Sequence, residues 1–443
     1  MSSLVIRNGV IVTMNDRFEI VRGHVSVRDG RIAALGPHAD DAPHERVIDA
    51  AGGYVLPGLI QTHLHLCQTL FRGYADDLPL MDWLRRRVWP LEAAHTAATL
   101  RVATRLATTE LLLGGTTAVL TMETVHDTEA VFEAAGESGI RATIGKCMMD
   151  ADDEVPKRLR EETRSSVDES VALHRRWHGA FDGRIRVAFA PRFAVSCSRE
   201  LLHAVAALST EQHLLVHTHA SESREELAIV RRLSGGQSNV EYLAAVGLAT
   251  PHLCAAHCVW VDEPEQALIA ERGVKVLHCP GSNLKLGSGI APVAKMRARG
   301  ITVSLGADGA ACNNRLDMFE EMRLAATLQA MHVHPGALPA PAVLWMATRA
   351  GAQTLGLDAE IGSVEVGKRA DLIVVDANRP HLAPGSDDVY STLVYAATGA
   401  DVRTTIVDGT VLVDEGRPVR VDAAEVTATA RVAARELAAR AGV

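Results

Sequence analysis

Two histidines stand two residues apart at the end of an apolar run, in the segment GLIQTHLHLCQTL (58–70). Because residues i and i+2 of a β-strand point to the same face, His63 and His65 can present two imidazole nitrogens to one metal ion. Alone, this pair is a weak signal, since the chain has 19 histidines and a histidine at a strand end is more often a hydrogen-bonded polar residue. The question is therefore whether other ligands gather at the same place.

Other apolar runs of the chain also end in polar residues that can do chemistry. These residues are Arg192, His217, His219, His257, His278 and Asp308. In a barrel of parallel strands the C-terminal strand ends meet at one face, where barrel enzymes build their active sites. Random polar residues would not collect at the same end of successive strands, so the convergence predicts a metal site there. The histidines interpreted as ordinary polar residues are His38, His95, His178, His332 and His381.

The expected donors are imidazole nitrogens and a carboxylate oxygen, which suit one divalent metal ion. Zn2+ fits this set best, and Fe2+ is compatible with it. Three histidines and one aspartate leave room for a water molecule, whose pKa a metal ion lowers from 15.7 to about 7. Proton movement between that water and a leaving group needs a carboxylate acid/base. Glu222, three residues beyond His219 where the chain leaves the strand, is the candidate.

Eight short apolar runs position these residues, and they alternate with long Ala/Leu/Glu/Arg-rich segments typical of βα units around a parallel sheet. The runs are GLIQTH (58–63), TTAVLT (116–121), RATIGK (141–146), RVAFAP (186–191), LLVHTH (214–219), LCAAHC (253–258), VKVLHC (274–279) and TVSLGAD (302–308). The pattern predicts an α/β fold with a (β/α)8 TIM-like barrel over residues 58–364, which carries the metal-dependent catalytic site.

The two ends of the chain share a different pattern, that of short β-strands separated by turns. Near the N-terminus, β-branched residues lie between Asn-Gly and Gly-Gly turn signals in LVIRNGVIVTM (4–14) and RVIDAAGGYVLPG (46–58). The same pattern of short strands and turns returns in TTIVDGTVLVDEGRPV (404–419). An Ala-rich helical segment follows from about Asp422 to Ala441. We therefore expect residues 1–57 and 365–443 to form one small β-sandwich domain with a C-terminal helix.

Bulk properties exclude several classes of partner. The net charge of -9 argues against a protein that binds nucleic acid through its phosphates. The N-terminal sequence has neither a signal-peptide pattern nor an apolar run long enough to span a membrane, so no membrane association is expected. Seven cysteines without a CxxC pair fit free thiols in a reducing compartment, which predicts a cytoplasmic location.

The chain resembles the amidohydrolase superfamily, and within it the mononuclear aminohydrolases that include S-adenosylhomocysteine/methylthioadenosine deaminases, guanine deaminases and triazine hydrolases. The segments that carry the resemblance are PGLIQTHLHLCQTLFRG (57–73), VHTHASE (216–222), AAHCV (255–259), HCPGSNLKLGSGIAPV (278–293), LGADGAACNN (305–314), GSVEVGKRADLIVVD (362–376) and VDGTVLV (407–413). They span almost the whole chain. The resemblance also implies a homodimer.

The resemblance implies a role for each site residue. The implied metal ligands are His63, His65, His219 and Asp308. Glu222 and His257 would contact the hydrolytic water or the intermediate, and His217 would be a strand-end neighbour of uncertain role. In the implied mechanism the activated water loses a proton to Asp308, Glu222 protonates a ring nitrogen, His257 helps polarise the nucleophile, and ammonia leaves. Binuclear members bridge their metals with a modified lysine where this chain has Arg192, which favours a single metal.

The substrate pocket resembles two groups at once. Gln68 and Arg192 match the residues with which guanine deaminases grip the purine edge, whereas adenosine-type deaminases usually have His at the position of Arg192. Trp83 lies in a candidate lid segment, where its ring could stack on a heterocycle or simply pack the loop. Glu92 matches a glutamate that contacts ribose in the adenosyl type, but a glutamate favoured in a first helical turn is an equal alternative.

These observations lead to one main hypothesis and two alternatives. The main hypothesis is a metal-dependent hydrolytic deaminase of an amino-substituted N-heterocycle, either an adenosyl thioether or a guanine/pterin-type base, acting on C–N bonds of cyclic amidines. The first alternative is a triazine-type hydrolase that releases chloride or an alkylamine. The second is a catalytically silent barrel that only binds a ligand. Pseudoenzymes typically lose a site residue, and this chain keeps the whole set.

Overall fold

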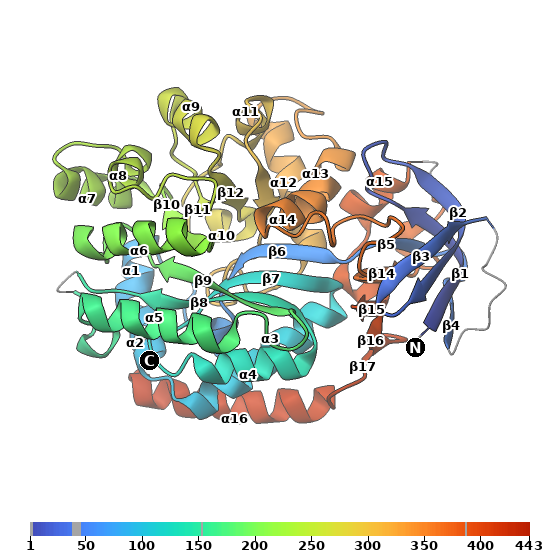
Figure 1. Cartoon of the computed structure of the whole chain (residues 1–443), viewed down its shortest axis with the longest axis horizontal. Helices are drawn as coiled ribbons and strands as arrows, with labels where there is room; N and C mark the ends of the chain where they lie inside the picture. Colours follow the sequence, from blue (N-terminus) through green and yellow to red (C-terminus); the bar gives the residue numbers. More distant parts are fainter. Residues whose placement is uncertain (1–2, 38–45, 152–153, 386–387) are drawn as a thin grey trace.

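The computed structural model of the chain describes all residues except 1–2, 38–45, 152–153 and 386–387, so His38 lies outside the described residues. Eight parallel strands form the central barrel (Figure 1). They are β6 (Leu59–Leu64), β7 (Thr116–Met122), β8 (Arg141–Met148), β9 (Ile185–Pro191), β10 (Val216–Ala220), β11 (Leu253–His257), β12 (Lys275–His278) and β13 (Val303–Leu305). All eight runs predicted from the sequence are strands, and the α/β barrel is confirmed.

The barrel closes between its first and last strands. The backbone N–H of Asp308 donates to the carbonyl of His63 at 3.0 Å, and the Thr62 hydroxyl donates to the carbonyl of Leu305 at 3.0 Å. Gly306 allows this approach, because a Cβ at that position would lie 2.5 Å from the carbonyl oxygen of His63. Closure therefore brings two predicted ligands, which are 245 positions apart in numbering, onto neighbouring backbone.

Helices cover the outside of the barrel. The longer ones are α3 (Ala97–Leu113), α4 (Glu129–Ser138), α5 (Thr163–Trp177), α6 (Arg199–Gln212), α7 (Arg224–Ser234), α8 (Asn239–Ala245), α9 (Glu263–Arg272), α12 (Met318–His332) and α13 (Ala340–Ala347); shorter ones are α10 (Pro280–Lys285), α11 (Val293–Ala298) and α14 (Arg349–Thr354). Local sequence sets their ends. Ser223 and Glu226 form a reciprocal capping box on α7, and α4 ends at Gly139, whose φ of 88° favours glycine.

A lid segment crosses the barrel face between β6 and α3. It starts with the 3-10 turn η1 (Leu66–Phe71) and continues through α1 (Leu80–Trp83), the π-helical turn η2 (Leu84–Val88) and α2 (Trp89–Ala93). A π-helical turn interrupts a regular helix and is frequent at functional sites. Here it lies in the same segment as Trp83, which the sequence placed in a lid.

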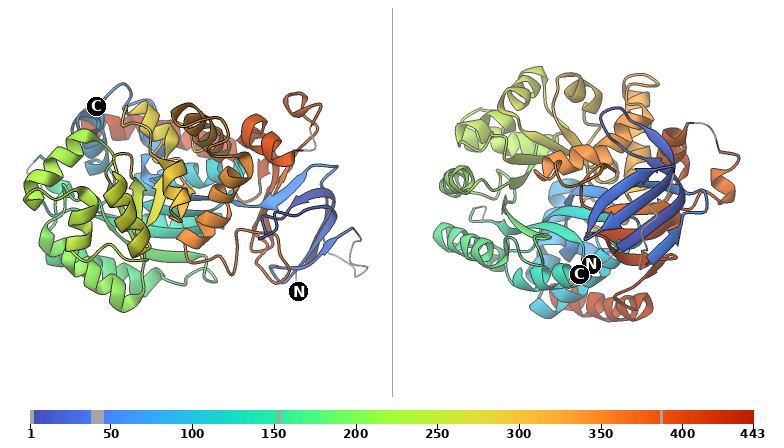
Figure 2. Two further views of the ribbon diagram at one scale, coloured as in Figure 1. Left: turned by 90° about the horizontal axis from the view of Figure 1, so that it is seen from above. Right: turned by 45° about the vertical axis from the view of Figure 1, so that its right-hand side comes forward.

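Strands from both ends of the chain form a second unit, as expected (Figure 2). They are β1 (Ser3–Val12), β2 (Ile20–Arg28), β3 (Arg31–Gly36), β4 (Arg46–Asp49), β5 (Tyr54–Pro57), β14 (Leu372–Val375), β15 (Val402–Val407), β16 (Thr410–Asp414) and β17 (Arg417–Pro418). The expected sandwich takes the form of one continuous hydrogen-bonded sheet around a shared apolar core, in which antiparallel β5 and β14 join the N-terminal and C-terminal parts.

The composite sheet lies beside the N-terminal ends of the barrel strands. Arg141, the first residue of β8, donates to Asp371 at 2.9 and 3.1 Å and approaches Asp408 at 3.1 Å, and these side chains are at most 10% exposed. The predicted metal ligands are at the opposite, C-terminal end of the barrel strands. The C-terminal helix α16 (Ala423–Ala441), which the sequence grouped with the β domain, packs instead against α3 of the barrel. The domain boundaries stay a prediction.

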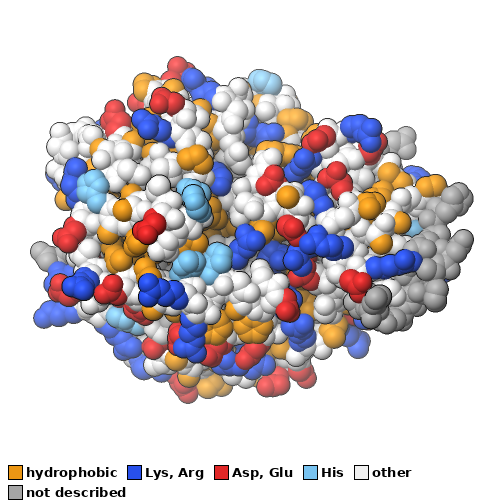
Figure 3. Space-filling model, in the orientation of Figure 1, with side chains coloured by type: hydrophobic (Ala, Val, Ile, Leu, Met, Phe, Trp, Pro, Cys, Tyr) orange, Lys and Arg blue, Asp and Glu red, His pale blue; other side chains and the backbone are white. Residues whose placement is uncertain are grey.

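The surface mixes both signs of charge. Figure 3 shows Lys and Arg side chains interspersed with Asp and Glu over the visible face, in keeping with the net charge of -9. Within the described part of the chain, no helix combines the length and the apolar character needed to cross a membrane.

Candidate active site

Four buried side chains and the partly buried His219 meet at the C-terminal end of the barrel. The ligand atoms of His63, His65 and Asp308 lie within 4.8 Å of one another, and so do those of His63, His219 and His257. The Nε2 atoms of His63 and His65 lie 3.3 and 3.2 Å from Oδ1 of Asp308. The structure therefore brings together all four predicted ligands and the predicted catalytic His257.

Backbone carbonyls fix the tautomers of two histidines. Nδ1 of His65 lies 2.7 Å from the carbonyl of Met122, and Nδ1 of His219 lies 2.7 Å from the carbonyl of Arg192. Because a carbonyl oxygen can only accept, each Nδ1 carries the proton and each Nε2 keeps a free lone pair. This is the arrangement by which proteins orient metal-binding histidines.

His63 is held by another histidine. Its Nδ1 lies 2.6 Å from Nε2 of His217, which is itself fully buried. Only one of these two nitrogens can carry the proton, so a lone pair on Nε2 of His63 requires Nδ1–H of His63 to donate to His217. His217, whose role the sequence left open, thus contacts a predicted ligand. Among the described residues, His278 stays outside both groups of ligand atoms.

Burial and neighbouring charges set the protonation states of the candidate ligands. Burial lowers the pKa of His63 to about 4 and holds the pKa of His219 well below its usual value, so both are neutral at neutral pH. Burial also opposes a charge on His65, but the hydrogen bond and charge of Asp308 outweigh it and raise its pKa. Burial alone would raise the pKa of Asp308, but the charge and hydrogen bonds of His63 and His65 hold it well below its usual range.

Two separations between the donor atoms fit one shared metal ion. Two ligands of a tetrahedral ion at 2.0–2.1 Å lie about 3.4 Å apart, close to the 3.2 and 3.3 Å that separate His65 and His63 from Asp308. Asp308 has a φ of 63° and His257 a φ of 71°, values that cost roughly 1–3 kcal/mol for residues other than glycine. Such strained backbone at strand ends aims both side chains at the centre of the cluster.

Glu222 and His257 face the same centre from the next strands. Oε2 of Glu222 lies 3.6 Å from Nε2 of His257, which in turn lies 3.8 Å from Oδ2 of Asp308. The hydroxyl of Ser288 donates to Oε1 of Glu222 at 3.3 Å. Burial raises the pKa of Glu222 to about 7, so this carboxyl exchanges a proton readily near neutral pH.

Helix α10 and the loop after it supply residues that sequence reasoning missed. Ser282 donates its hydroxyl to Oδ2 of Asp308 at 2.7 Å, and Oδ1 of Asn283 accepts from Nδ1 of His257 at 2.9 Å. Both lie in the segment HCPGSNLKLGSG, which carries the resemblance without pointing to any particular residue. The available signal was the presence of small polar residues directly after a strand end, which is common in loops.

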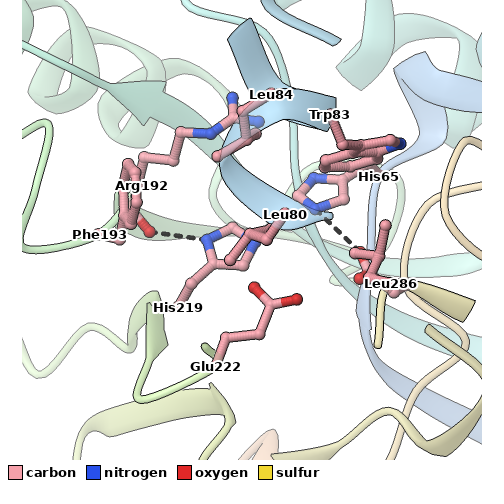
Figure 4. Close-up of a pocket in the computed structure, with 10 residues that line it drawn as sticks. His65, Leu80, Trp83, Leu84, Arg192, Phe193, His219, Glu222 and Leu286 are labelled. Carbon is pink, nitrogen blue, oxygen red and sulfur yellow. Dashed lines mark hydrogen bonds and ion pairs between the residues drawn. The ribbon is translucent and has the colours of Figure 1, made fainter. Parts of the chain in front are cut away.

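A small pocket lies above the cluster (Figure 4). Its described lining residues are His65, Leu80, Trp83, Leu84, Arg192, Phe193, His219, Glu222, Leu286 and Asp308. Trp83 is 4% exposed and forms part of an apolar wall contributed mainly by the lid segment. The cavity leaves about 20 Å³ of free room, which suffices for about one water molecule.

Three predicted substrate residues form one buried network. Nη1 of Arg192 donates to Oε2 of Glu92 at 2.6 Å, Nη2 donates to Oε1 at 3.3 Å, and Nε2 of Gln68 donates to Oε1 at 3.1 Å. Arg192 lines the pocket, whereas Gln68 and Glu92 lie outside the described lining set. Their contact with substrate stays a prediction, and the structure places them behind the guanidinium.

Comparisons with known proteins agree with this geometry. The model of the amidohydrolase family matches residues 54–412. A 5'-deoxyadenosine deaminase of Methanosarcina acetivorans is 42% identical over 443 residues, covering 100% of both chains. A 5-methylthioadenosine/S-adenosylhomocysteine deaminase of Symbiobacterium thermophilum is 41% identical over 445 residues, covering 99% of both.

Three solved structures also resemble this chain over nearly its whole length. An adenosine deaminase of Xanthomonas campestris with bound zinc has a TM-score of 0.92 at 34% identity, covering 98% of both chains. An atrazine chlorohydrolase of Arthrobacter aurescens complexed with zinc has a TM-score of 0.90 at 26% identity, covering 97% of this chain and 100% of the other. A guanine deaminase of Clostridium acetobutylicum with bound guanine has a TM-score of 0.83 at 27% identity, covering 93% and 100%.

The match runs from the last strand of the N-terminal part to the returning strands of the composite sheet, and it includes every residue of the histidine and aspartate cluster. The chain belongs to the amidohydrolase family.

Proposed function

We propose that this protein is a metal-dependent hydrolase that removes an exocyclic amine, as ammonia, from a purine-type heterocycle. The observation that carries this proposal is the position of Glu222. Burial raises the pKa of its carboxyl group to about 7, and Glu222 lines the same pocket as three of the four candidate metal ligands, His65, His219 and Asp308. The adenosyl deaminases at 41 and 42% identity support a purine-type substrate.

The residues that would hold the metal are His63, His65, His219 and Asp308. A divalent ion bound there supplies a Lewis acid that makes water nucleophilic at neutral pH. Imidazole nitrogens with one carboxylate favour Zn2+, with Fe2+ as the alternative. The zinc reported in the related solved structures supports Zn2+ for this chain.

The chain's own carboxyl groups move the protons in the proposed reaction. Asp308, kept ionised by its histidine neighbours, accepts a proton from the attacking water. Glu222 delivers a proton to the ring nitrogen next to the reacting carbon, because its carboxyl group lines the pocket. His257 carries its proton on Nδ1, so its Nε2 accepts a hydrogen bond from the nucleophile. The proton held by Asp308 then passes to the exocyclic amine, which leaves as ammonia, while the hydroxyl on the tetrahedral carbon returns a proton to Glu222 and becomes the ring carbonyl.

The rest of the pocket suits a flat ring. Leu80, Trp83, Leu84, Phe193 and Leu286 form apolar walls around the polar floor. Such walls exclude bulk water and pack against the faces of a heterocycle, while a few polar groups fix its orientation. The small free volume of the closed pocket means that the proposed reaction occurs away from bulk solvent.

A triazine-type hydrolysis is the second candidate, and the structural match to the atrazine chlorohydrolase favours it. The same metal-activated water would displace chloride or an alkylamine from a triazine ring. Only the pocket walls would separate the two substrates. A catalytically silent barrel is disfavoured because Glu222 lines the pocket beside the histidine and aspartate cluster, which contains all four candidate ligands.

We further propose a cytoplasmic homodimer. All seven cysteines lie among the described residues and are buried free thiols, which supports a reducing compartment. Light scattering on the purified protein tests the dimer, and a mass equal to the 47.4 kDa of one chain would contradict it.

The function is tested with zinc-loaded protein and a panel of free purines, purine nucleosides, pterin and chlorotriazines. Ammonia and chloride are assayed separately, with Glu222→Gln as the control for background hydrolysis. Ammonia release from a purine-type compound is expected. Chloride release from a chlorotriazine without ammonia release from any purine would favour the second candidate, and turnover of none of them would refute both.

A further inference from the structure

The network of Gln68, Glu92 and Arg192 carries information about the substrate that the relatives' names do not. Its members come from η1, α2 and the segment after β9, and they are 0, 3 and 3% exposed. Both carboxylate oxygens of Glu92 accept hydrogen bonds from the other two residues. Three hydrogen bonds to Glu92 are therefore in place before any substrate arrives.

This commitment removes Glu92 from ribose recognition. A carboxylate has about four lone-pair sites, and the hydrogen bonds from Arg192 and Gln68 occupy three of those on Glu92. Accepting from both hydroxyls of a ribose diol takes two sites, so Glu92 would have to release Arg192 or Gln68. Releasing Arg192 would leave a guanidinium charge buried without its partner, which proteins strongly disfavour. Glu92 also lies behind Arg192 rather than among the described residues that line the pocket.

Arg192 is the polar group that the network presents to the pocket. A guanidinium has five N–H donors and no acceptor, and the pair with Glu92 uses two of these donors. The group that meets Arg192 must therefore accept hydrogen bonds. Because Glu92 already neutralises the guanidinium, a neutral acceptor fits better than a second carboxylate. A ring carbonyl beside a ring nitrogen is the purine edge that an arginine fork matches in bidentate fashion.

The guanidinium is held in place from several sides. Glu92 accepts hydrogen bonds from two of its nitrogens, and Gln68 donates a hydrogen bond that orients Glu92. Gln68 packs tightly on the backbone at Gly309, where an added Cβ would lie 1.9 Å from its Oε1. Gly309 directly follows Asp308, so the network is anchored to the backbone of the metal cluster. Such rigid donors discriminate between substrates more sharply than mobile ones.

We propose that the substrate is a free amino-oxo heterocycle whose ring carbonyl binds Arg192, with Glu92 and Gln68 as positioning residues, rather than a nucleoside read through Glu92. This inference rests on the proposed deaminase function and narrows its substrate class. It separates this chain from relatives named for adenosine derivatives, although they are 41 and 42% identical to it.

The first test compares substrates with the wild-type protein, so its result does not depend on whether a variant folds. Zinc-loaded enzyme is assayed for ammonia with guanine, pterin, 2-aminopurine, which lacks the ring carbonyl, and 5'-deoxyadenosine. A site built to bind a carbonyl rejects an analogue that lacks it by about 10⁴-fold in kcat/KM. We expect guanine or pterin to exceed both 2-aminopurine and 5'-deoxyadenosine by a factor of that order.

Variants then separate positioning from general stability. Arg192→Lys keeps the charge but loses the planar pair of guanidinium donors. Glu92→Gln removes the carboxylate that orients those donors. Both should lower kcat/KM for the carbonyl substrate by about 10²-fold or more, with the ratio to 2-aminopurine falling as well. Arg141→Lys is the matched control, because it disturbs an equally buried arginine pair at the other end of the barrel. It should lower the Tm and leave the substrate ratio unchanged.

The possible outcomes separate a failure of this inference from a failure of the proposed deaminase function. If 5'-deoxyadenosine exceeds guanine and pterin and Glu92→Gln raises its KM, the deaminase function stands and Glu92 reads ribose, so the inference is overturned. A kcat/KM for 2-aminopurine within tenfold of that for guanine would also overturn it. If no compound releases ammonia, the proposed function itself fails.

Discussion

Asn283 offers a sharp test of how His257 works, because one hydrogen bond sets the tautomer of its ring. Oδ1 of Asn283 accepts from Nδ1–H of His257 at 2.9 Å, while Nε2 of His257 faces Glu222 and Asp308 at 3.6 and 3.8 Å. In Asn283→Leu the side chain keeps a similar volume but no longer accepts. The ring proton is then drawn to Nε2, next to two carboxyl groups, and the lone pair that receives the nucleophile is lost.

The magnitude follows from the buried donor left without a partner, which costs about 1–3 kcal/mol. At 1.36 kcal/mol per tenfold in rate, this corresponds to a fall in kcat/KM of about 5- to 150-fold. We expect the fall to be in kcat, with zinc content and KM nearly unchanged, because Asn283 is not in the described pocket lining.

The assay is steady-state ammonia release together with zinc content by mass spectrometry. Gln266→Leu is the matched control, because it removes a buried amide that donates to the carbonyl of Val261 at 3.1 Å on the outer helix α9. It should lower the free energy of unfolding by a similar amount without changing kcat. If Asn283→Leu keeps kcat within twofold of wild type, the assigned tautomer has no part in the reaction.

Four further results are expected. Glu222→Gln should lower kcat by about 10²- to 10⁴-fold while zinc content is retained, and a loss of zinc as well would show that Glu222 acts on the metal site. Chelation should lower the Tm, since metal at a hundred times its Kd adds about 2.7 kcal/mol to the free energy of unfolding; zinc should restore it in wild type but not in His65→Ala. Burial raises the pKa of Glu321 to about 8, so its contribution to stability is full below its usual pKa and is lost as the pH rises through about 8. Relative to Glu321→Gln, urea denaturation of wild type should therefore show a loss of about 1.4 kcal/mol per pH unit between about pH 5 and 8, and parallel curves would contradict this. Arg141→Met leaves Asp371 buried without its cation and should lower the free energy of unfolding by about 3–5 kcal/mol, whereas a loss below about 1 kcal/mol would show that the pair adds little.

The sequence was sufficient to predict the barrel and the gathering of histidines and Asp308 at one face, because short-range periodicity locates the strands and their ends. Alternation places His63 and His65 on one face of a strand, and parallel strands bring His219 and Asp308 to the same end. The choice of His219 over His217 as a ligand came from the family resemblance. Pairings across the fold follow no such period. The pair of Glu92 and Arg192 spans a hundred residues, and only the packing of α2 against the end of β9 shows that Glu92 is occupied.

The roles of Ser282 and Asn283 were also beyond the sequence. A short helix follows β12, and its inward face depends on how α10 packs rather than on residue type. The C-terminal helix α16 illustrates the same limit. Its sequence predicts a helix correctly, but nothing in its pattern of apolar residues states that it covers α3 of the barrel instead of the composite sheet.

Arg192 links substrate selection to the metal cluster. Its carbonyl accepts from Nδ1 of His219 and so sets the lone pair of a candidate ligand, while its guanidinium lines the pocket and binds Glu92 of the lid segment. The same segment supplies Trp83 to the pocket wall. A change at Glu92 would therefore act on the residue that provides both the guanidinium donors and the hydrogen bond that orients His219.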